Sequence, residues 1–256
     1  MKIEGSVAVI TGGVSGLGRA TLACFVAQGC KVIALDMNDE LGAEVSAEYG
    51  DMVLYHKTNV TLEDDVKQAL ANGIKKFGRI DICVNCAGNG DAGKTYSRRN
   101  GLMPLETFKR IVDVNLIGSF NVARLCVEQM VKNEPNDDNE KGVIINTASV
   151  AAFEGQIGQV PYAASKAGIV GMTLTLARDL SSLGIRVNTI APGLIDTPML
   201  ARLSDDVRHT LEQSVLCPKR LGQPSEFAGA VQFLVNNGYM NGEVIRMDGG
   251  IRMQPK

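Results

Sequence analysis

The sequence predicts an α/β fold with one parallel sheet of seven strands and helices on both of its faces. Short apolar runs rich in β-branched residues alternate along the chain with stretches that have helical periodicity. Such alternation is typical of βαβ units, in which neighbouring strands are parallel and are buried from both sides. No internal repeat and no linker interrupts the 256 residues, so we expect a single domain covering residues 1–256.

The first half of the chain contains four of the expected strands. The run VAVIT (7–11) ends in a glycine-rich turn, and the run KVIALD (31–36) ends in an aspartate. Two further runs follow at 53–56 and 80–87. Each run is bounded by turn-forming residues, which is typical of a short buried strand. The spacing of apolar residues predicts the intervening helices at about 16–28, 39–49 and 62–78.

The second half predicts three more strands and two long helices. The strands are expected at 142–149, 185–193 and 242–250, and the helices at about 104–132 and 161–182. Two segments depart from this pattern: the polar stretch 133–142, which predicts a loop, and residues 194–222, which follow the sixth strand. Because ligands bind outside the carboxyl ends of parallel strands, we expect the segment 194–222 to form a flap over the binding site.

The turn after the first strand reads TGGVSGLG (11–18), with Gly12, Gly16 and Gly18 close together. Glycines let a ligand approach the backbone, and the N-terminus of a helix offers free N–H groups and a positive dipole to a phosphate. The spacing G-x-x-x-G-x-G differs from the usual G-x-G-x-x-G fingerprint. The turn predicts a Rossmann fold that binds the pyrophosphate of a dinucleotide, and the alternative is an ordinary tight turn between strand and helix.

Asp36 closes the second expected strand. A carboxylate at this position of a dinucleotide-binding fold meets the ribose hydroxyls of the adenosine, and it repels a 2′-phosphate. The glycine-rich turn has no Arg or Lys before Arg19 to attract such a phosphate. The sequence therefore predicts NAD as the cofactor in preference to NADP. The alternative is that Asp36 only caps a turn or a helix.

Tyr162 and Lys166 stand four residues apart in an expected helix, so they share one face of it. A lysine ammonium beside a tyrosine favours the phenolate, as does the positive ring of bound NAD⁺. Such a tyrosine can accept a proton from an alcohol or donate one to a ketone. Ser149 ends the fifth strand and could hydrogen-bond the substrate oxygen. Taken singly, the tyrosine–lysine pair also fits an ordinary amphipathic helix, and Ser149 also fits a helix cap.

These motifs together resemble the short-chain dehydrogenase/reductase family. The resemblance extends over nearly the whole chain through TGGVSGLG, NCAG (85–88), Asn115 in DVNLIGSF, Ser149, YAASK and APG (191–193). It implies that Tyr162 is the general acid/base, that Lys166 assists it and binds the nicotinamide ribose, and that Ser149 orients the substrate. It also implies that Asn115 holds a water in a proton relay.

The same resemblance implies contacts along the cofactor. The pyrophosphate turn would be lined by Ser15 and Leu17, and adenine would be flanked by Asn59 and Val60. The family often has Asp where this chain has Asn59, so we expect a weaker polar contact between this side chain and the amino group of adenine. The remaining contacts implied by the family are Cys86, Ala87 and Gly88 beneath the cofactor and Pro192, Gly193, Ile195 and Thr197 at its nicotinamide end.

Three segments are similar to the type II 3-hydroxyacyl-CoA dehydrogenase branch of the family: residues 146–174, 242–255 and the inserted GKTYSRRNG (93–101). This similarity implies NAD-dependent oxidation of L-3-hydroxyacyl-CoA to 3-ketoacyl-CoA, tolerance for hydroxysteroids, and a homotetramer built partly from the two long helices. Gln159 would line the substrate pocket. The alternatives are a 3-oxoacyl-carrier-protein reductase, a hydroxysteroid dehydrogenase, or a non-catalytic scaffold.

The inserted segment carries Lys94, Arg98 and Arg99 at the expected carboxyl edge of the sheet. A CoA thioester carries several phosphates, so we hypothesise that these three cations contact them. The alternative is a solvated loop with scattered charge.

Composition and charge bear on nucleic-acid binding, membrane insertion, the compartment and metal binding. A net charge of −2 without a basic block does not indicate nucleic-acid binding, and no apolar run approaches the roughly 20 residues of a membrane span. The N-terminus lacks the features of a signal peptide. Six scattered cysteines suggest a reducing compartment, the cytoplasm or, in a eukaryote, the mitochondrial matrix. Cys83 and Cys86 should face opposite sides of a strand, so we expect no metal.

Overall fold

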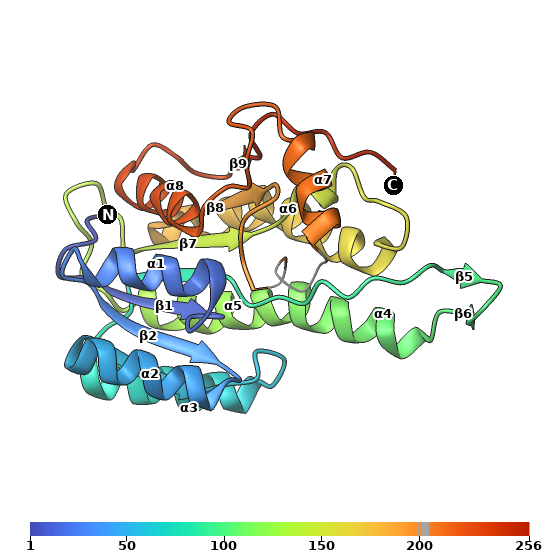
Figure 1. Cartoon of the computed structure of the whole chain (residues 1–256). Helices are drawn as coiled ribbons and strands as arrows, with labels where there is room; N and C mark the ends of the chain where they lie inside the picture. Colours follow the sequence, from blue (N-terminus) through green and yellow to red (C-terminus); the bar gives the residue numbers. More distant parts are fainter. Residues whose placement is uncertain (199, 201–204, 256) are drawn as a thin grey trace.

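The computed structural model describes residues 1–198, 200 and 205–255. Its centre is a seven-stranded sheet in the order β3-β2-β1-β4-β7-β8-β9, and every neighbouring pair in this sheet is parallel (Figure 1). The prediction of a seven-stranded parallel sheet with helices on both faces is therefore confirmed. The strands are β1 (Val7–Thr11), β2 (Lys31–Asp36), β3 (Val53–Lys57), β4 (Ile82–Asn85), β7 (Gly142–Thr147), β8 (Ile185–Pro192) and β9 (Val244–Met247).

Helices cover both faces of the sheet because each strand sends alternate side chains to opposite sides. One face packs on α1 (Gly16–Val26), α2 (Asp39–Tyr49) and α8 (Pro224–Asn236). The other face packs on α3 (Glu63–Phe77), α5 (Gly118–Met130) and α6 (Val160–Leu180). The strand order reverses at β1, where β2 lies on one side and β4 on the other, and ligands of such sheets bind outside the carboxyl ends of the strands at this switch point.

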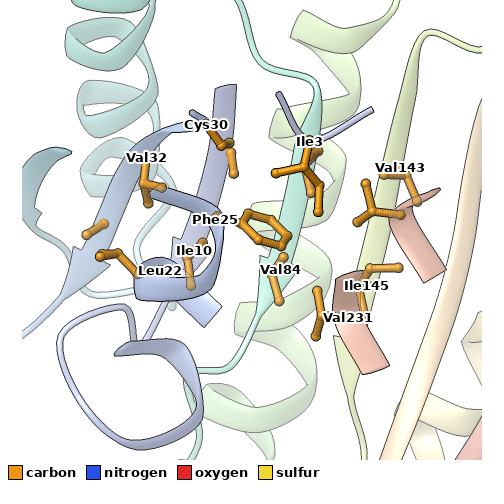
Figure 2. Close-up of a cluster of buried hydrophobic side chains, with 14 of the residues drawn as sticks. Ile3, Ile10, Leu22, Phe25, Cys30, Val32, Val84, Val143, Ile145 and Val231 are labelled. Carbon is orange, nitrogen blue, oxygen red and sulfur yellow. The ribbon is translucent and has the colours of Figure 1, made fainter. Parts of the chain in front are cut away.

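The core beneath α1 and α8 shows why these strands are buried on both sides. Ile10, Val84 and Ile145 point from three strands toward Phe25 of α1 and Val231 of α8, and all five side chains are fully buried (Figure 2). The residues that alternate with them along the strands belong to the opposite core. This two-sided packing keeps the carboxyl ends of β1, β4, β7 and β8 together at one edge of the sheet.

Three differences from the sequence prediction bear on the site, and the bounds of several other elements, such as β7 and β9, differ from the expected ones by a few residues. The helix expected over 104–132 consists of α4 (Leu105–Val112), a π-helical turn (Asp113–Ile117) and α5. The strand expected over 80–87 is shorter at both ends, since β4 covers only Ile82–Asn85. The insertion near residue 95 forms an antiparallel hairpin, which periodicity could not reveal because its strands, β5 (Tyr96–Ser97) and β6 (Gly101–Leu102), are so short.

The expected flap contains the helix α7 (Asp205–Ser214), while residues 199 and 201–204 of it lie outside the described residues. No helix in the described part of the chain combines the length and the apolar character needed to cross a membrane.

Candidate active site

The glycine-rich turn brings the backbone of β1 against the start of α1. Gly12 has φ +62°, a left-handed conformation that favours glycine. A Cβ on Gly18 would lie 2.1 Å from the carbonyl oxygen of Gly12, so no side chain fits at that position. Ser15 is the N-cap of α1 but forms no side-chain cap bond, and the first turn of α1 carries no acid. The turn therefore presents open backbone and free N–H groups, as a bound pyrophosphate requires.

Asp36 lies beside this turn, at the carboxyl end of β2. Its Oδ2 accepts a hydrogen bond from Val14 N at 3.4 Å, and its Oδ1 accepts from Met37 N at 2.7 Å and Asn38 N at 3.2 Å. The carboxylate thus both stabilises the turn after β2 and remains half-buried next to the glycine-rich turn. The two interpretations offered by the sequence, a turn-forming acid and a ribose ligand, are compatible in this geometry.

Thr11 ties the ends of β1 and β4 together at the ligand edge. Its Oγ1 accepts hydrogen bonds from Cys86 N and Ala87 N, each at 3.0 Å. These two residues and Gly88 lead away from β4 toward α6, where a Cβ on Gly88 would lie 3.4 Å from Asn115 Oδ1 and 3.7 Å from Lys166 Nζ. Sequence reasoning missed Thr11. Its position as the last residue of β1, one residue before the first glycine, was the available signal.

Asn59 and Val60 follow β3 at the far end of the same edge. Asn59 Oδ1 accepts from Thr61 N at 3.1 Å and from Thr61 Oγ1 at 2.8 Å. That oxygen therefore already has two donors within the chain, which limits its use as an acceptor for an adenine amino group. The carbonyl of Val60 accepts a hydrogen bond from Asn121 Nδ2 at 2.9 Å, which anchors this loop to α5.

Ser149, Tyr162 and Lys166 meet at the carboxyl end of β7. Ser149 caps a short 3-10 helix (Val150–Ala152), where its Oγ accepts from Ala151 N at 3.1 Å. Lys166 is only 5% exposed, and its Nζ donates to the Thr147 carbonyl at 2.8 Å and lies 5.8 Å from the centre of the Tyr162 ring. The register of α6 places the tyrosine and the lysine one turn apart on its sheet-facing side.

Burial dominates the protonation of this pair. It lowers the pKa of Lys166 to about 8, because the ammonium loses its water, and the nearby Cys86 acts weakly in the opposite direction. Burial raises the pKa of Tyr162 above its usual value, while a hydrogen bond with Ser149 lowers it. The sequence predicts that Lys166 lowers the pKa of Tyr162. In the chain by itself, desolvation of the phenolate outweighs any such effect.

Asn115 lies in the π-helical turn and is completely buried. Its Oδ1 accepts from Asn89 N at 2.7 Å, and its Nδ2 donates to Asn89 O at 2.9 Å and to Ser165 Oγ at 3.0 Å. Ser165 in turn donates to the carbonyl of Tyr162 at 2.7 Å. The π turn therefore connects the loop after β4 with the helix that carries Tyr162, and such turns are frequent at functional sites.

The segment that follows β8 reaches back over the glycine-rich turn. Pro192 ends β8, Gly193 N donates to Met247 O at 2.9 Å, and Ile195 forms a bridge with Gly222. Thr197 lies close to the turn, because a Cβ on Gly16 would be 3.7 Å from its Cγ2. The structure thus brings the four residues expected at the nicotinamide end to the same edge as the glycine-rich turn.

The residues expected to contact substrate lie on two neighbouring segments. Gln159 is the N-cap of α6, and its Oε1 accepts from Gln156 N at 3.0 Å. The hairpin segment begins beside it, since Gly93 N donates to Gly158 O at 2.8 Å. From there the hairpin extends away from the body of the molecule (Figure 1), with Lys94, Arg98 and Arg99 all exposed.

Cys83 and Cys86 pack on opposite faces of the sheet, Cys83 in the core beneath α5 and Cys86 against the core beneath α1. Burial raises the pKa of the Cys86 thiol to about 12. The described residues contain no group of three His, Cys, Asp or Glu side chains arranged to hold a metal ion.

Comparison with known proteins shows which family model the chain matches and which proteins it is similar to. Residues 6–208 match the model of the short chain dehydrogenase family. The chain is 53% identical over 254 residues to 3-hydroxyacyl-CoA dehydrogenase type-2 of Drosophila melanogaster, which covers 99% of this chain and 100% of that protein.

Two solved structures are similar over nearly their full length. The 3-hydroxyacyl-CoA dehydrogenase type-2 of Mycobacterium avium has a TM-score of 0.94 and 42% identity, with 98% of each chain covered. A 7α-hydroxysteroid dehydrogenase complexed with NADH and 7-oxo glycochenodeoxycholic acid has a TM-score of 0.89 and 28% identity, covering 100% of this chain and 97% of that one.

Proposed function

This chain belongs to the short-chain dehydrogenase family, and from that membership we propose that it oxidises L-3-hydroxyacyl-CoA to 3-ketoacyl-CoA with NAD⁺. One observation carries the proposal: the full-length similarity to enzymes named 3-hydroxyacyl-CoA dehydrogenase type-2. The convergence of Ser149, Tyr162 and Lys166 at the carboxyl end of β7 supports it, because an alcohol oxidation needs a proton acceptor next to a hydride acceptor.

The cofactor is a nicotinamide dinucleotide, NAD or NADP. The absence of space for a Cβ at Gly18 and the uncapped N-terminus of α1 fit its pyrophosphate. We propose NAD as the physiological form, because the half-buried Asp36 carboxylate beside the turn would repel a 2′-phosphate. Along the rest of the cofactor we propose contacts from Asn59, Val60, Cys86, Ala87, Gly88, Pro192, Gly193, Ile195 and Thr197.

The bound nicotinamide would accept hydride during oxidation and return it during reduction. Tyr162 would accept the proton of the substrate hydroxyl as the hydride leaves, and Ser149 would hold the substrate oxygen by a hydrogen bond. Lys166, with a pKa of about 8, is mainly charged at pH 7. Its ammonium and the positive ring of NAD⁺ would oppose the burial that raises the pKa of Tyr162. Asn115 would support a water that carries the proton onward.

The substrate assignment rests on the similarity and on the surroundings of the tyrosine. Ile157 and Val160, which flank Gln159, expose apolar side chains that could contact an acyl chain. The exposed cations of the hairpin could meet the phosphates of CoA. The same hydrophobic surroundings would admit a hydroxysteroid, and the 7α-hydroxysteroid dehydrogenase supports this as a second activity.

A 3-oxoacyl-carrier-protein reductase would use the same four catalytic residues but NADPH. We expect 3-ketoacyl-CoA to be reduced much faster with NADH than with NADPH, measured as absorbance loss at equal cofactor concentrations. A strong preference for NADPH would contradict the assignment and favour the reductase.

A scaffold function would not depend on the tyrosine, so Tyr162→Phe tests the catalytic proposal directly. We expect turnover of 3-hydroxyacyl-CoA to fall by at least about 10²-fold, because the proton acceptor is lost. NADH should still bind with unchanged affinity, measured by its fluorescence. If Tyr162→Phe keeps the turnover of the parent protein, the proposed mechanism is wrong.

A further inference from the structure

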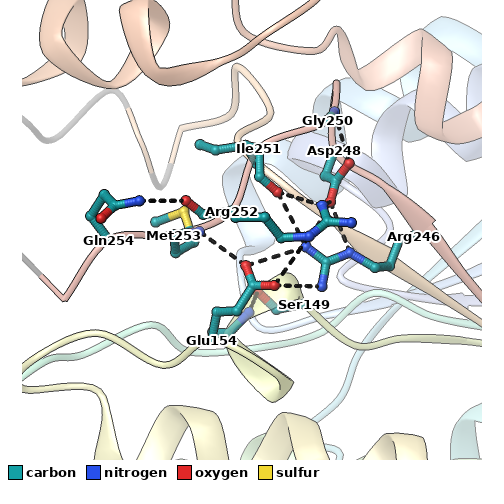
Figure 3. Close-up of polar contacts among 10 residues, drawn as sticks. Ser149, Glu154, Arg246, Asp248, Gly250, Ile251, Arg252, Met253 and Gln254 are labelled. Atoms are coloured by element: carbon teal, nitrogen blue, oxygen red, sulfur yellow. Dashed lines mark hydrogen bonds and ion pairs between the residues drawn. The ribbon is translucent and has the colours of Figure 1, made fainter.

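The loop between Ser149 and Tyr162 is held by a cluster of charges that the catalytic residues do not include. Glu154 of this loop accepts two hydrogen bonds from Arg246 of β9, at 3.0 and 3.3 Å, and one from Met253 N at 2.9 Å (Figure 3). Arg252 lies 3.5 Å from the same carboxylate. One glutamate thus joins the loop both to the last strand of the sheet and to the segment that follows it.

Asp248 completes the cluster from the opposite side. Its Oδ2 accepts from Arg246 Nε at 2.9 Å and from Arg252 Nη1 at 3.1 Å, and its side chain is only 9% exposed. Arg246 is therefore fixed by an acid on each side, and Phe153 stacks on its guanidinium with the ring centre 5.3 Å away. Paired planar contacts of this kind have a defined geometry, unlike an isolated surface ion pair.

Two hydrogen bonds to main-chain carbonyls extend the attachment toward the catalytic helix. Gln156 Nε2 donates to Gln254 O at 2.9 Å, and Ile157 N donates to Pro255 O at 3.0 Å. Gln156 N then donates to the side chain of Gln159, the N-cap of α6. The segment 248–255 therefore contacts the loop at three successive places between Ser149 and Tyr162.

The hydrophobic core holds only the beginning of this loop, where Val150 and Ala151 are buried. Phe153 and Ile157 are 49% and 51% exposed, and Gly155 and Gly158 add backbone freedom on either side of Ile157. The polar contacts with β9 and the segment 248–255 are what restrain it in this structure. Without them, the hydrogen bond from Gly93 N to Gly158 O would be the main remaining polar contact of the middle of the loop with the rest of the fold.

Taking the proposed function as its basis, we propose that Glu154 is a positioning residue. It transmits the placement of the segment 248–255 to Ser149 and Gln159, so that the substrate oxygen meets Tyr162 in a reactive orientation. A displacement of about 1 Å at a reacting centre can cost about 10²-fold in rate, so a restraint outside the catalytic residues can control turnover. The contacts proposed for the pyrophosphate and the adenosine of the cofactor come from other segments, so cofactor binding should change little.

The test compares three variants with the parent protein, using a 3-hydroxyacyl-CoA and NAD⁺. Glu154→Gln keeps the shape of the side chain and removes its charge. A second variant lacks residues 252–256, and a third combines both changes. We expect each single variant to lose about tenfold or more in kcat/KM, while NADH binds within about twofold of the parent. Because both changes break the same attachment, the combined loss should be far smaller than the product of the single losses.

Glu140→Gln is the matched control. Glu140 also accepts a hydrogen bond from a strand arginine, Arg186 at 2.7 Å, but it lies at the opposite end of the strands. It should lower the melting temperature without changing kcat/KM below the transition. If Glu154→Gln behaves in the same way, or if the two losses multiply, the positioning role is wrong while the proposed function stands. A parent protein that does not oxidise 3-hydroxyacyl-CoA would instead refute the proposed function, and the positioning role with it.

Discussion

Lys166 combines deep burial with a hydrogen bond to a backbone carbonyl, that of Thr147. The bond holds the amine in place, but it does not replace the lost hydration of the charge, and the pKa of the amine falls to about 8. The fold therefore carries a group that would bind its proton more tightly in the unfolded chain. This cost is typical of residues placed for chemistry and not for stability.

The pH dependence of stability should reveal this cost. Below pH 8 the buried lysine is charged and its desolvation opposes folding. Between pH 8 and 10.5 the folded state binds fewer protons than the unfolded state, so this contribution to the free energy of unfolding should rise, by on the order of 1–3 kcal/mol. Lys166→Met removes the rise, and urea unfolding followed by circular dichroism at several pH values measures it.

The quantity to compare is the difference in the free energy of unfolding between the parent and Lys166→Met at each pH, because the buried thiols and Tyr162 titrate in both proteins. Lys132→Met, at an exposed position, serves as the control and should leave the slope with pH as in the parent. A slope that Lys166→Met does not flatten would show that the amine is not desolvated in the folded protein.

At the scale of elements, the β5–β6 hairpin extends away from the central sheet (Figure 1). Its cations Lys94, Arg98 and Arg99 form no ion pair with any residue that the structure describes. Unpaired cations beside the entrance to a site leave their charge available to an anionic ligand, and this attraction falls as salt rises.

Replacing all three cations with Ala should therefore weaken a phosphate-bearing substrate selectively. We expect KM for a 3-hydroxyacyl-CoA to rise by about tenfold or more, while KM for a phosphate-free hydroxysteroid changes by less than about twofold. Removing the same number of charges from α3, at Lys67, Lys75 and Lys76, controls for net charge. Equal effects on both substrates would discard the phosphate contacts.

The long helices illustrate how far sequence patterns reach at this scale. Periodicity predicted a helix over 104–132 and another over 161–182, and the chain is helical in both places. The π turn around Asn115 could not be foreseen, because it covers only five residues, too few to show a periodicity of their own. Thr11 and Glu154 were missed for another reason: their partners, Cys86 and Arg246, are far away in sequence, and only the assembled sheet brings them close.

For the molecule as a whole, the remaining exposed apolar surface bears on assembly. Ile117 and Phe120 near the start of α5, and Leu174 of α6, are 44–49% exposed. Gly168 is explained within the chain, because a Cβ there would lie 2.6 Å from Leu116. Gly171, one turn further along α6, has no atom within 4 Å of such a Cβ. We propose that the surface formed by Ile117, Phe120, Leu174 and Gly171 packs against other copies of the chain in a homotetramer.

Gly171→Glu should place a charge in that contact and disrupt the assembly. We expect the mass measured by light scattering to fall from that of a tetramer to that of a smaller species. Ala71→Glu, which adds the same charge at an exposed position of α3, should keep the parent mass. If the parent protein is already monomeric, or if Gly171→Glu leaves the tetramer intact, this interface is wrong.

The sequence was sufficient for the sheet, since β-branched runs and glycine turns act locally and each strand is buried by neighbours of the same kind. It was also sufficient to nominate Ser149, Tyr162 and Lys166, whose spacing follows from one strand and one helix. Protonation was harder to foresee. The sequence shows that Lys166 lies near Tyr162, but the depth of burial, which reverses the expected shift of the tyrosine, depends on the packing of several elements.

The position of β9 in this topology has a consequence for synthesis on the ribosome. The four side chains that we propose to be catalytic are all made by residue 166, and the glycine-rich turn is made well before them. Arg246, however, takes its place only when β9 pairs with β8 at the edge of the sheet. A nascent polypeptide halted before β9 would contain all four of these side chains but would lack Arg246, the partner of Glu154 in the loop between Ser149 and Tyr162. We therefore expect activity to appear late in synthesis and in a single step.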